Sequence, residues 1–324
     1  MARRYRSVAA LLAAGLAAVA PAETPAPLGI HGNRTTFEIA PVLLAAERLY
    51  GSAETVKMGG IPNLVGAPGI RGFEAPGRAD LATHADTQAL RYSVDHPDLR
   101  IILTVAEGHY RILARRSAGI AALGDLRGKR IAAIPTTSSG YFLHRMLESA
   151  GLKDGDVTIV PISPLSAMPA ALAEGRIDAM TIWEPEIEKA AALLGANGIG
   201  FTGDGIYREL FGLNSTAAAL ADRDTRKRIV RFVREVIAAS AAIRATPALG
   251  QAQVARATGE PAAVVAASWP HQTFPATLVP DLLDTLVAEE RWLAARDARV
   301  PRDRATLAKL IDPSILAEAM QAPR

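Results

Sequence analysis

Hydrophobic positions along this chain follow two alternating rhythms. Runs that are almost wholly apolar, such as Leu99–Val105 and Arg130–Ile134, are typical of strands buried on both faces of a sheet. Between such runs, apolar residues recur every three or four positions, as in Thr35–Tyr50 and His84–Tyr92, which predicts helices. Strands that alternate with helices predict an α/β fold with doubly wound, mostly parallel sheets.

The same pattern marks where elements begin and end. Thr35 and Glu38 have the spacing of a capping box, so the first helix should open at Thr35. Asp222 should cap a long helix, and the chain then reads almost wholly helical to its end. Gly59–Gly77 is rich in glycine and proline and is the least readable part of the chain. Further strands are expected over Leu28–His31, Thr55–Met58, Leu81–Thr83, Tyr110–Ala114, Asp178–Trp183 and Phe211–Leu220.

A short pattern occurs twice. Gly77-Arg78-x-Asp80 and Gly175-Arg176-x-Asp178 each end a helix and open a buried strand, and a polar loop follows each strand. Two similar α/β lobes would explain this repeated pattern, although Gly-x-x-Asp is also a common turn. Because ligands bind beyond the carboxyl ends of parallel strands, both polar loops should face one cleft.

The first 22 residues have the features of a secretory signal. Three arginines precede Val8–Ala20, an apolar run that is too short for a membrane anchor. Ala20-Pro21-Ala22 is a cleavage motif, so the mature chain should begin at Glu23, with cleavage after Ala20 as the second option. The paired arginines at positions 3 and 4 leave twin-arginine export open beside the general route.

Composition narrows the class of protein. The chain has no cysteine, hence no disulfide and no lipoprotein anchor, and with a signal it should be a periplasmic protein. Removing three arginines from 36 Lys and Arg residues leaves 33, equal to the 33 Asp and Glu residues. No basic block is interleaved with aromatic residues, so nothing indicates nucleic acid as a partner. About 300 mature residues are enough for two domains.

Hydroxyl and charged side chains gather where the predicted strands end. Thr137, Ser138 and Ser139 open a helix directly after a strand, which suits an anionic or strongly polar small molecule. The structural alternatives are that these residues, Thr35 and Asp86 only cap helices, and that Glu184 only faces a helix N-terminus. The full set of candidate ligand-binding residues is Thr35, Thr36, His84, Asp86, Thr87, Thr137, Ser138, Ser139, Tyr141, Trp183 and Glu184.

Motifs for catalysis or metal binding are not legible. The six histidines form no pair at helical spacing, and neither a Gly-x-Ser-x-Gly nor a phosphate-binding glycine motif occurs. Ser138 and Ser139 have no base at a readable spacing. We therefore expect no catalytic residue, no metal and no cofactor.

Several motifs of the central segment resemble a known family by their joint order. The chain resembles the periplasmic solute-binding proteins of ABC importers, in the branch that binds sulfonates, taurine, nitrate or pyrimidine precursors of thiamine. The resemblance is sharp over residues 77–220, looser over 26–76, and mainly a helical pattern after 220. The motifs are Gly128-Lys129-Arg130-Ile131, Thr137-Ser138-Ser139, Gly151-Leu152, Asp156-Val157, Ala171-Leu172, Gly175-Arg176-Ile177-Asp178-Ala179 and Trp183-Glu184-Pro185.

This resemblance implies a type II periplasmic binding protein fold, with two doubly wound α/β lobes around a central cleft and a helical C-terminal region. Lobe one would comprise residues 26–108 and 206–324, and lobe two residues 109–205. The protein would be a monomer that captures a small polar solute and delivers it to an ABC permease and its ATPase.

The alternative function is an enzyme on the same fold, acting in thiamine-pyrimidine or menaquinone synthesis. Pyrimidine-synthesising relatives carry a cysteine-rich iron motif that this chain lacks, and an export signal argues against cytosolic synthesis. The ligand stays open: the hydroxyls suit a sulfonate, carboxylate or nitrate, whereas Asp86 and Glu184 suit an amine or a ring N–H. Together these groups permit a zwitterion or a neutral heterocycle.

Overall fold

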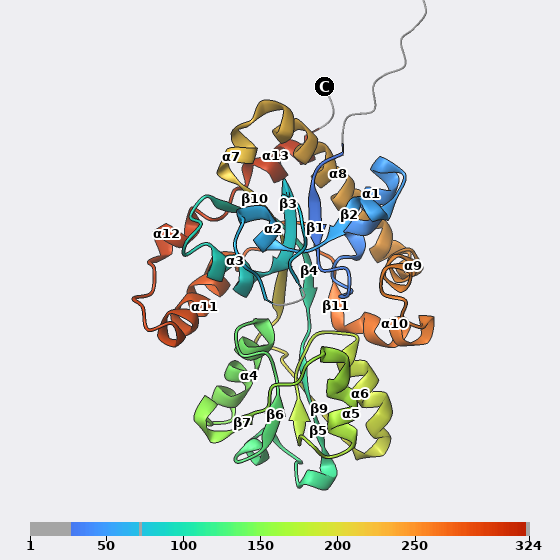
Figure 1. Ribbon diagram of the computed structural model, residues 1–324, viewed down its shortest axis with the longest axis vertical. Helices are drawn as coiled ribbons and strands as arrows, with labels where there is room; N and C mark the ends of the chain where they lie inside the picture. Colours follow the sequence, from blue (N-terminus) through green and yellow to red (C-terminus); the bar gives the residue numbers. More distant parts are fainter. Residues whose placement is uncertain (1–26, 71–72, 322–324) are drawn as a thin grey trace, which may run out of the picture.

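A computed structural model describes residues 27–70 and 73–321 of the chain. The predicted signal segment and its cleavage site lie outside these residues. Figure 1 shows two bodies, one above the other, each built around one sheet and flanked by helices. Within the described residues, none of the helices is long and apolar enough to span a bilayer.

The upper body contains a six-stranded sheet in the order β11-β4-β10-β3-β1-β2. Strand β1 pairs in parallel with β2 and β3, whereas β10 runs antiparallel to both of its neighbours, β3 and β4. The strands are β1 (Ile30–Gly32), β2 (Val56–Met58), β3 (Leu81–Ala85), β4 (Leu99–Gly108), β10 (Glu209–Thr216) and β11 (Gln272–Thr273).

The lower body contains a five-stranded sheet in the order β7-β6-β8-β5-β9. Strand β6 pairs in parallel with β7 and β8, and β5 runs antiparallel to β8 and β9. The strands are β5 (Arg111–Arg115), β6 (Arg130–Ala132), β7 (Thr158–Ile159), β8 (Ala179–Met180) and β9 (Gly198–Thr202).

The chain crosses between the two sheets twice. It descends through residues 109–110, between β4 and β5, and returns through residues 203–208, between β9 and β10. The strands that begin after each crossing, β5 and β10, run antiparallel to both of their neighbours. The two bodies are thus joined by two short neighbouring segments, which is the geometry of a hinge.

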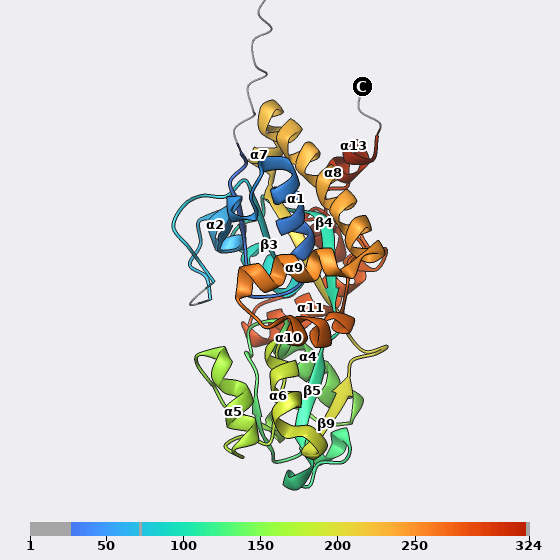
Figure 2. The same cartoon turned by 90° about the vertical axis from the view of Figure 1, so that its right-hand side faces the viewer.

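Helices flank both sheets, and the segment after β10 is almost wholly helical. Figure 2 shows α1, α8 and α9 over the same part of the upper body, where α1 and α8 pack against each other. The upper body has α1 (Ala40–Tyr50), α2 (Ile61–Val65), α3 (Asp86–Tyr92), α7 (Ala217–Ala221), α8 (Arg223–Ala245), α9 (Pro247–Thr258), α10 (Ala262–Ser268), α11 (Leu282–Arg296), α12 (Arg304–Ala308) and α13 (Ser314–Met320), and the lower body has α4 (Ser138–Ser149), α5 (Met168–Ala173) and α6 (Glu186–Leu194).

Several sequence-based boundaries differ from the structure; for example, the strand expected over Asp178–Trp183 covers only Ala179–Met180. Helix α1 begins at Ala40 rather than Thr35, because Asn33 holds the two threonines in a turn before the helix: its Oδ1 accepts from Thr35, and its carbonyl accepts from Thr36. The strand expected over Phe211–Leu220 ends at Thr216, whose hydroxyl accepts from the Ala219 N–H and caps α7. Gly59–Gly77, to which the sequence assigned no element, contains the short helix α2, with proline in its first turn.

The twofold Gly-Arg-x-Asp pattern marks the same turn in both sheets. Gly77 and Gly175 both have positive φ, 99° and 77°, which glycine adopts without steric cost. Asp80 Oδ2 accepts the Gly29 N–H at 2.9 Å, just before β1, and Asp178 Oδ2 accepts the Arg130 N–H at 3.0 Å at the start of β6. Each aspartate thus ties the beginning of a strand to its parallel neighbour.

Candidate functional site

A small cavity lies where the two bodies face each other. Its volume is about 20 Å³, room for little more than one water molecule, so the molecule is in a closed conformation. The upper body lines it with Asn33, Thr36, Glu38, His84, Ala85, Gln88, Glu209 and Phe211, the lower body with Thr137, Ser138 and Trp183, and the first crossing with Tyr110.

The topology explains why these residues meet. Asn33 and Thr36 follow the end of β1, and His84 is the second-last residue of β3. Thr137 and Trp183 follow β6 and β8 of the other sheet. Parallel strands present their carboxyl ends at one edge, so both sheets direct their loops to the shared interface.

Five of the candidate residues line this cavity: Thr36, His84, Thr137, Ser138 and Trp183. The Trp183 ring packs on Phe73, with ring centroids 5.8 Å apart, and Phe73 in turn meets His84 edge-on. Burial at this interface lowers the pKa of His84 to about 4, so its imidazole is neutral near pH 7. The aromatic groups thus form an apolar wall beside polar groups.

The hydroxyl residues Thr137, Ser138 and Ser139 have different hydrogen-bond partners. Ser138 Oγ lies 3.0 Å from the Tyr110 hydroxyl at the cavity. Ser139 is turned away, because its hydroxyl donates to the Thr181 carbonyl at 2.7 Å and fixes the start of α4 against the segment after β8. Thr137 is the N-cap residue of α4, but its side chain accepts no hydrogen bond from the first N–H groups of this helix.

Asp86 and its neighbour Thr87 lie outside the cavity lining. Asp86 Oδ1 accepts from the Thr87 N–H at 2.8 Å, and its Oδ2 accepts from the Leu210 N–H at 3.1 Å. The Tyr207 hydroxyl also donates to Asp86, at 3.3 Å. The carboxylate therefore ties α3 to the second crossing. Thr87 is fully buried within the upper body.

Three further candidates also have other partners. The Thr35 hydroxyl donates to Asn33 Oδ1 at 2.6 Å. Tyr141 packs edge-on against Tyr207, with centroids 5.0 Å apart, and lines an outer groove instead. Glu184 Oε1 accepts from Arg111 at 2.9 Å, and its Oε2 accepts from the Glu188 N–H at the start of α6, so both oxygens are occupied.

Two acidic residues of the cavity were missed by the sequence reasoning. Burial raises the pKa of Glu38 to about 7, and burial raises the pKa of Glu209 well above its usual range. Glu38 fits a helix cap in sequence, and Glu209 lies just before the strand predicted from Phe211 onward. The available signal was a glutamate directly before the apolar residues Leu210 and Phe211, at the head of a strand that is wholly buried, where a charge is costly.

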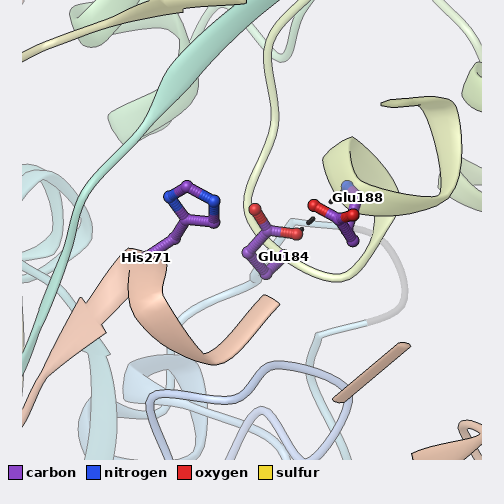
Figure 3. A group of neighbouring side chains, drawn as sticks. All are labelled: Glu184, Glu188 and His271. Atoms are coloured by element: carbon purple, nitrogen blue, oxygen red, sulfur yellow. Dashed lines mark hydrogen bonds between the residues drawn. The ribbon is translucent and has the colours of Figure 1, made fainter. Parts of the chain in front are cut away.

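A second acidic cluster lies beside the cavity (Figure 3). One oxygen each of Glu184 and Glu188 and a ring nitrogen of His271 lie within 4.8 Å of one another, a ligand set that divalent cations accept. However, Arg111 Nη2 bonds both carboxylates, at 2.9 and 2.6 Å. The guanidinium offsets one of the two negative charges, so the described contacts are those of an ion-pair cluster.

Solved structures share this architecture. The alkanesulfonate-binding protein SsuA from Xanthomonas axonopodis pv. citri, bound to MOPS, superposes with a TM-score of 0.66 at 22% identity, over 90% of this chain and 99% of that one. The desulfurization enzyme DSZB superposes with a TM-score of 0.58 at 16% identity, over 90% of this chain and 98% of that one. The expected two-sheet α/β binding-protein fold with a helical C-terminal region is therefore confirmed.

Sequence comparison gives a relative and a family. A protein of Escherichia coli K12 described as a putative aliphatic sulfonates-binding protein is 33% identical over 174 residues, 52% of this chain. This chain thus spans about half the length of that relative, 51%. The family model described as NMT1/THI5 like matches residues 38–213, which include both crossings and most of the cavity lining. The chain therefore belongs to the NMT1/THI5-like family.

Proposed function

We propose that this protein is the solute-binding component of an ABC importer, which captures a small polar solute in the periplasm and delivers it to a membrane permease and its ATPase. The observation that carries the proposal is the closed cavity, walled by both sheets and hinged at two short crossings. The sulfonate-binding relatives support it, since their names describe solute capture on the same fold.

Solute capture would require the two bodies to open and close. The cavity of about 20 Å³ is smaller than any solute of several atoms, so the two bodies must separate to admit one. A solute that touches both bodies favours the closed state by its differential contacts, and a permease can read that state. Residues 26–108 with 206–324, and 109–205, would be the two lobes that move in a monomer cleaved after Ala22.

The candidate residues fall into two groups under this proposal. Thr36, His84, Thr137, Ser138 and Trp183 would contact the solute directly. The remaining candidates would not contact the solute but would hold these five residues in position. They are Thr35, Asp86, Thr87, Ser139, Tyr141 and Glu184.

A thermal-shift screen tests the proposal. The mature chain is incubated with sulfonates, amino sulfonates, nitrate, carboxylates and pyrimidines, and a solute at a hundred times its dissociation constant should add about 2.7 kcal/mol of stability. Small-angle scattering with the same solute should show a smaller radius of gyration. If no class of small solute raises the melting temperature, the proposal fails.

An enzyme is the second candidate, because the fold also carries a desulfurization enzyme. The two functions differ in what happens to the bound solute. A binding protein returns one unchanged molecule per chain, whereas an enzyme accumulates product beyond one equivalent. Mass spectrometry of the incubated solute separates these outcomes.

A further inference from the structure

Glu289 of α11 is a fully buried acid without a hydrogen-bond donor of its own. Its side chain is 0% exposed, and neither carboxyl oxygen has a hydrogen-bond partner among the described residues. The carboxyl group lies against that of Asp86, which is also buried, at the start of α3. The Tyr207 hydroxyl lies beside both acids, but its one proton is donated to Asp86. An ionised carboxylate in such a place would be very costly to bury.

The contact between the two carboxyl groups requires a proton. Ionised carboxylates only accept hydrogen bonds, so two of them cannot bond each other, whereas a proton on one makes a strong O–H···O bond. Asp86 suits the ionised role, because three donors already point at it. They are the N–H groups of Thr87 and Leu210, at 2.8 and 3.1 Å, and the Tyr207 hydroxyl, at 3.3 Å. Glu289 has none of these donors and therefore suits the protonated role.

The neighbouring ionisable groups do not replace this proton with a positive charge. The strongest influences on Glu289 are burial and the charge of Asp86, which raise its pKa well above the usual range, and burial raises the pKa of Asp86 to about 6. The other groups that face the pair are acidic or phenolic, and nearby arginines bond other acids. The former are Tyr207, Glu209 of β10 and Tyr141 of α4; the latter are Arg299 and Arg302 on Glu290, Arg208 on Asp281, Arg304 on Asp284 and Arg145 on Glu148.

The acid pair is also the anchor of the second crossing. Tyr207 lies within this crossing, Leu210 follows it in β10, and both donate to Asp86. The Tyr207 ring packs edge-on against Tyr141 of the lower body, with centroids 5.0 Å apart, and against Tyr110 of the first crossing, at 6.5 Å. One side chain therefore connects the acid pair of the upper body with both crossings and with the lower body.

We infer that Asp86 and Glu289 share one proton, and that detachment of the second crossing from the upper body is coupled to the loss of this proton. While the crossing is attached, the buried pair retains the proton. When Tyr207 and Leu210 leave Asp86, water reaches the pair, and Glu289 gives its proton to solvent at neutral pH, as an exposed glutamate does. The crossing is therefore held more firmly at pH 6 than at pH 8. This device does not depend on what the cleft binds.

Glu289→Gln tests the inference, because the glutamine amide can donate to Asp86 but has no proton to lose. Urea unfolding of the native chain and of the variant is measured between pH 6 and pH 8. Relative to the variant, the unfolding equilibrium constant of the native chain should rise about tenfold per pH unit, which is the linkage of one proton. Other buried acids, such as Glu38 and Glu209, are present in both chains, so their contributions cancel.

Hydrogen exchange of the Leu210 amide reports on the crossing itself. Its protection factor in the native chain should fall about tenfold per pH unit relative to Glu289→Gln over the same range. The matched control is Glu174→Gln, which replaces an exposed carboxylate in the turn after α5 that pairs with Arg176. It should follow the native chain in both measurements, because an exposed carboxylate is ionised whether the crossing is attached or not.

Equal pH dependence of unfolding in the native chain and in Glu289→Gln would overturn the inference, because the pair would then hold no extra proton. A difference in unfolding without one at the Leu210 amide would also overturn it, because the proton would not govern the crossing. Should the variant not fold, the NMR shift of the Glu289 carboxyl carbon in the native chain decides: a protonated value at pH 7 supports the inference, and ionised values for Glu289 and Asp86 overturn it. Solute capture is judged separately by the thermal-shift screen.

Discussion

At the scale of single residues, we expect Glu38 to couple closure to pH. Its pKa is about 7 in the closed conformation, against 4.5 for an ordinary glutamate. Below pH 4.5 the carboxyl is protonated in both conformations, and no cost arises. As pH rises from 4.5 to 7, the closed state progressively loses up to about 3 kcal/mol relative to a hydrated, open cleft, at about 1.36 kcal/mol per pKa unit.

We therefore expect the protein without solute to open as pH rises from 5 to 8, with a growing radius of gyration in small-angle scattering. Glu38→Gln has no proton to lose and should show a weaker pH dependence. Glu174→Gln should open like the native chain. A radius that stays constant between these pH values in the native chain would show that Glu38 does not control closure.

Ser138 and Ser139 offer a second contrast between neighbouring residues. Ser139→Ala removes a buried bond to the Thr181 carbonyl and should lower the free energy of unfolding by about 1–3 kcal/mol, with solute affinity altered little. Ser138→Ala, at the cavity, should instead weaken solute affinity by about 0.5–1.5 kcal/mol. Urea unfolding and calorimetry on both variants measure the split, and the reverse pattern would exchange their roles.

The sequence located this hydroxyl cluster because it follows an apolar strand and opens a helix. It could not separate Ser138 from Ser139, since they are consecutive and differ only in which side of the α4 start they occupy. It missed Glu209 for a related reason: the acid is local to β10 in sequence, whereas its neighbours Glu38 and Tyr110 come from distant segments. Long-range convergence leaves no local pattern.

At the scale of elements, the turn before β8 is stabilised by ion pairs between Asp178 and two arginines, Arg115 and Arg130. Arg130 and Arg115 hold the pKa of Asp178 at about 2, against an ordinary 3.8. Because this pKa is lowered in the folded state, the ionised Asp178 carboxylate stabilises the fold above pH 3.8. This contribution is lost as pH falls toward 2. Asp178→Asn should therefore lower the free energy of unfolding by about 2 kcal/mol at pH 7, and by progressively less as pH falls below 4.

Urea unfolding between pH 3 and pH 7 measures this difference. Asp224→Asn is the control, because Asp224 is an exposed residue that pairs with Lys227 at 3.7 Å, and such pairs contribute little. A deficit in Asp178→Asn that does not change with pH would assign the role of Asp178 to shape rather than to charge.

Elements with strong periodicity were predictable, and their ends were less so. Helix α8, capped by the Asp222 carboxylate on the Thr225 N–H, follows the expected apolar stripe and cap. The start of α1 was misplaced because Asn33, outside the apparent capping box, took the hydrogen bonds of Thr35 and Thr36. Competition between two local bonding partners is decided by tertiary packing, here by the burial of Glu38.

At the scale of the whole molecule, the two-body architecture could be anticipated from the repeated Gly-Arg-x-Asp turn and the strand–helix alternation. The contacts that hold the bodies closed could not. Lys189 of α6 in the lower body bonds Glu260, which lies just before α10 of the upper body. Both residues belong to surface segments whose sequences carry ordinary helical patterns, so only the closed fold places them together.

This ion pair gives a last prediction. Glu260 lies outside the cavity lining, so Glu260→Gln leaves the site intact and removes only a contact made on closure. A half-buried pair contributes about 0.5–1 kcal/mol, which corresponds to a roughly two- to fivefold loss of solute affinity, expressed as faster release. Stopped-flow measurements give the rate of solute release. Added salt should reduce the difference in release rate between the variant and the native chain toward zero, because salt screens the ion pair.

The matched control is Glu235→Gln. Glu235 of α8 pairs with Arg48 of α1 at 3.4 Å, and both helices belong to the upper body. That pair is present whether the bodies are open or closed, so its loss cannot bias closure and should leave the release rate unchanged. Equal effects of the two variants would mean that the Lys189–Glu260 pair persists when the bodies separate, and that release is controlled by contacts within the cavity alone.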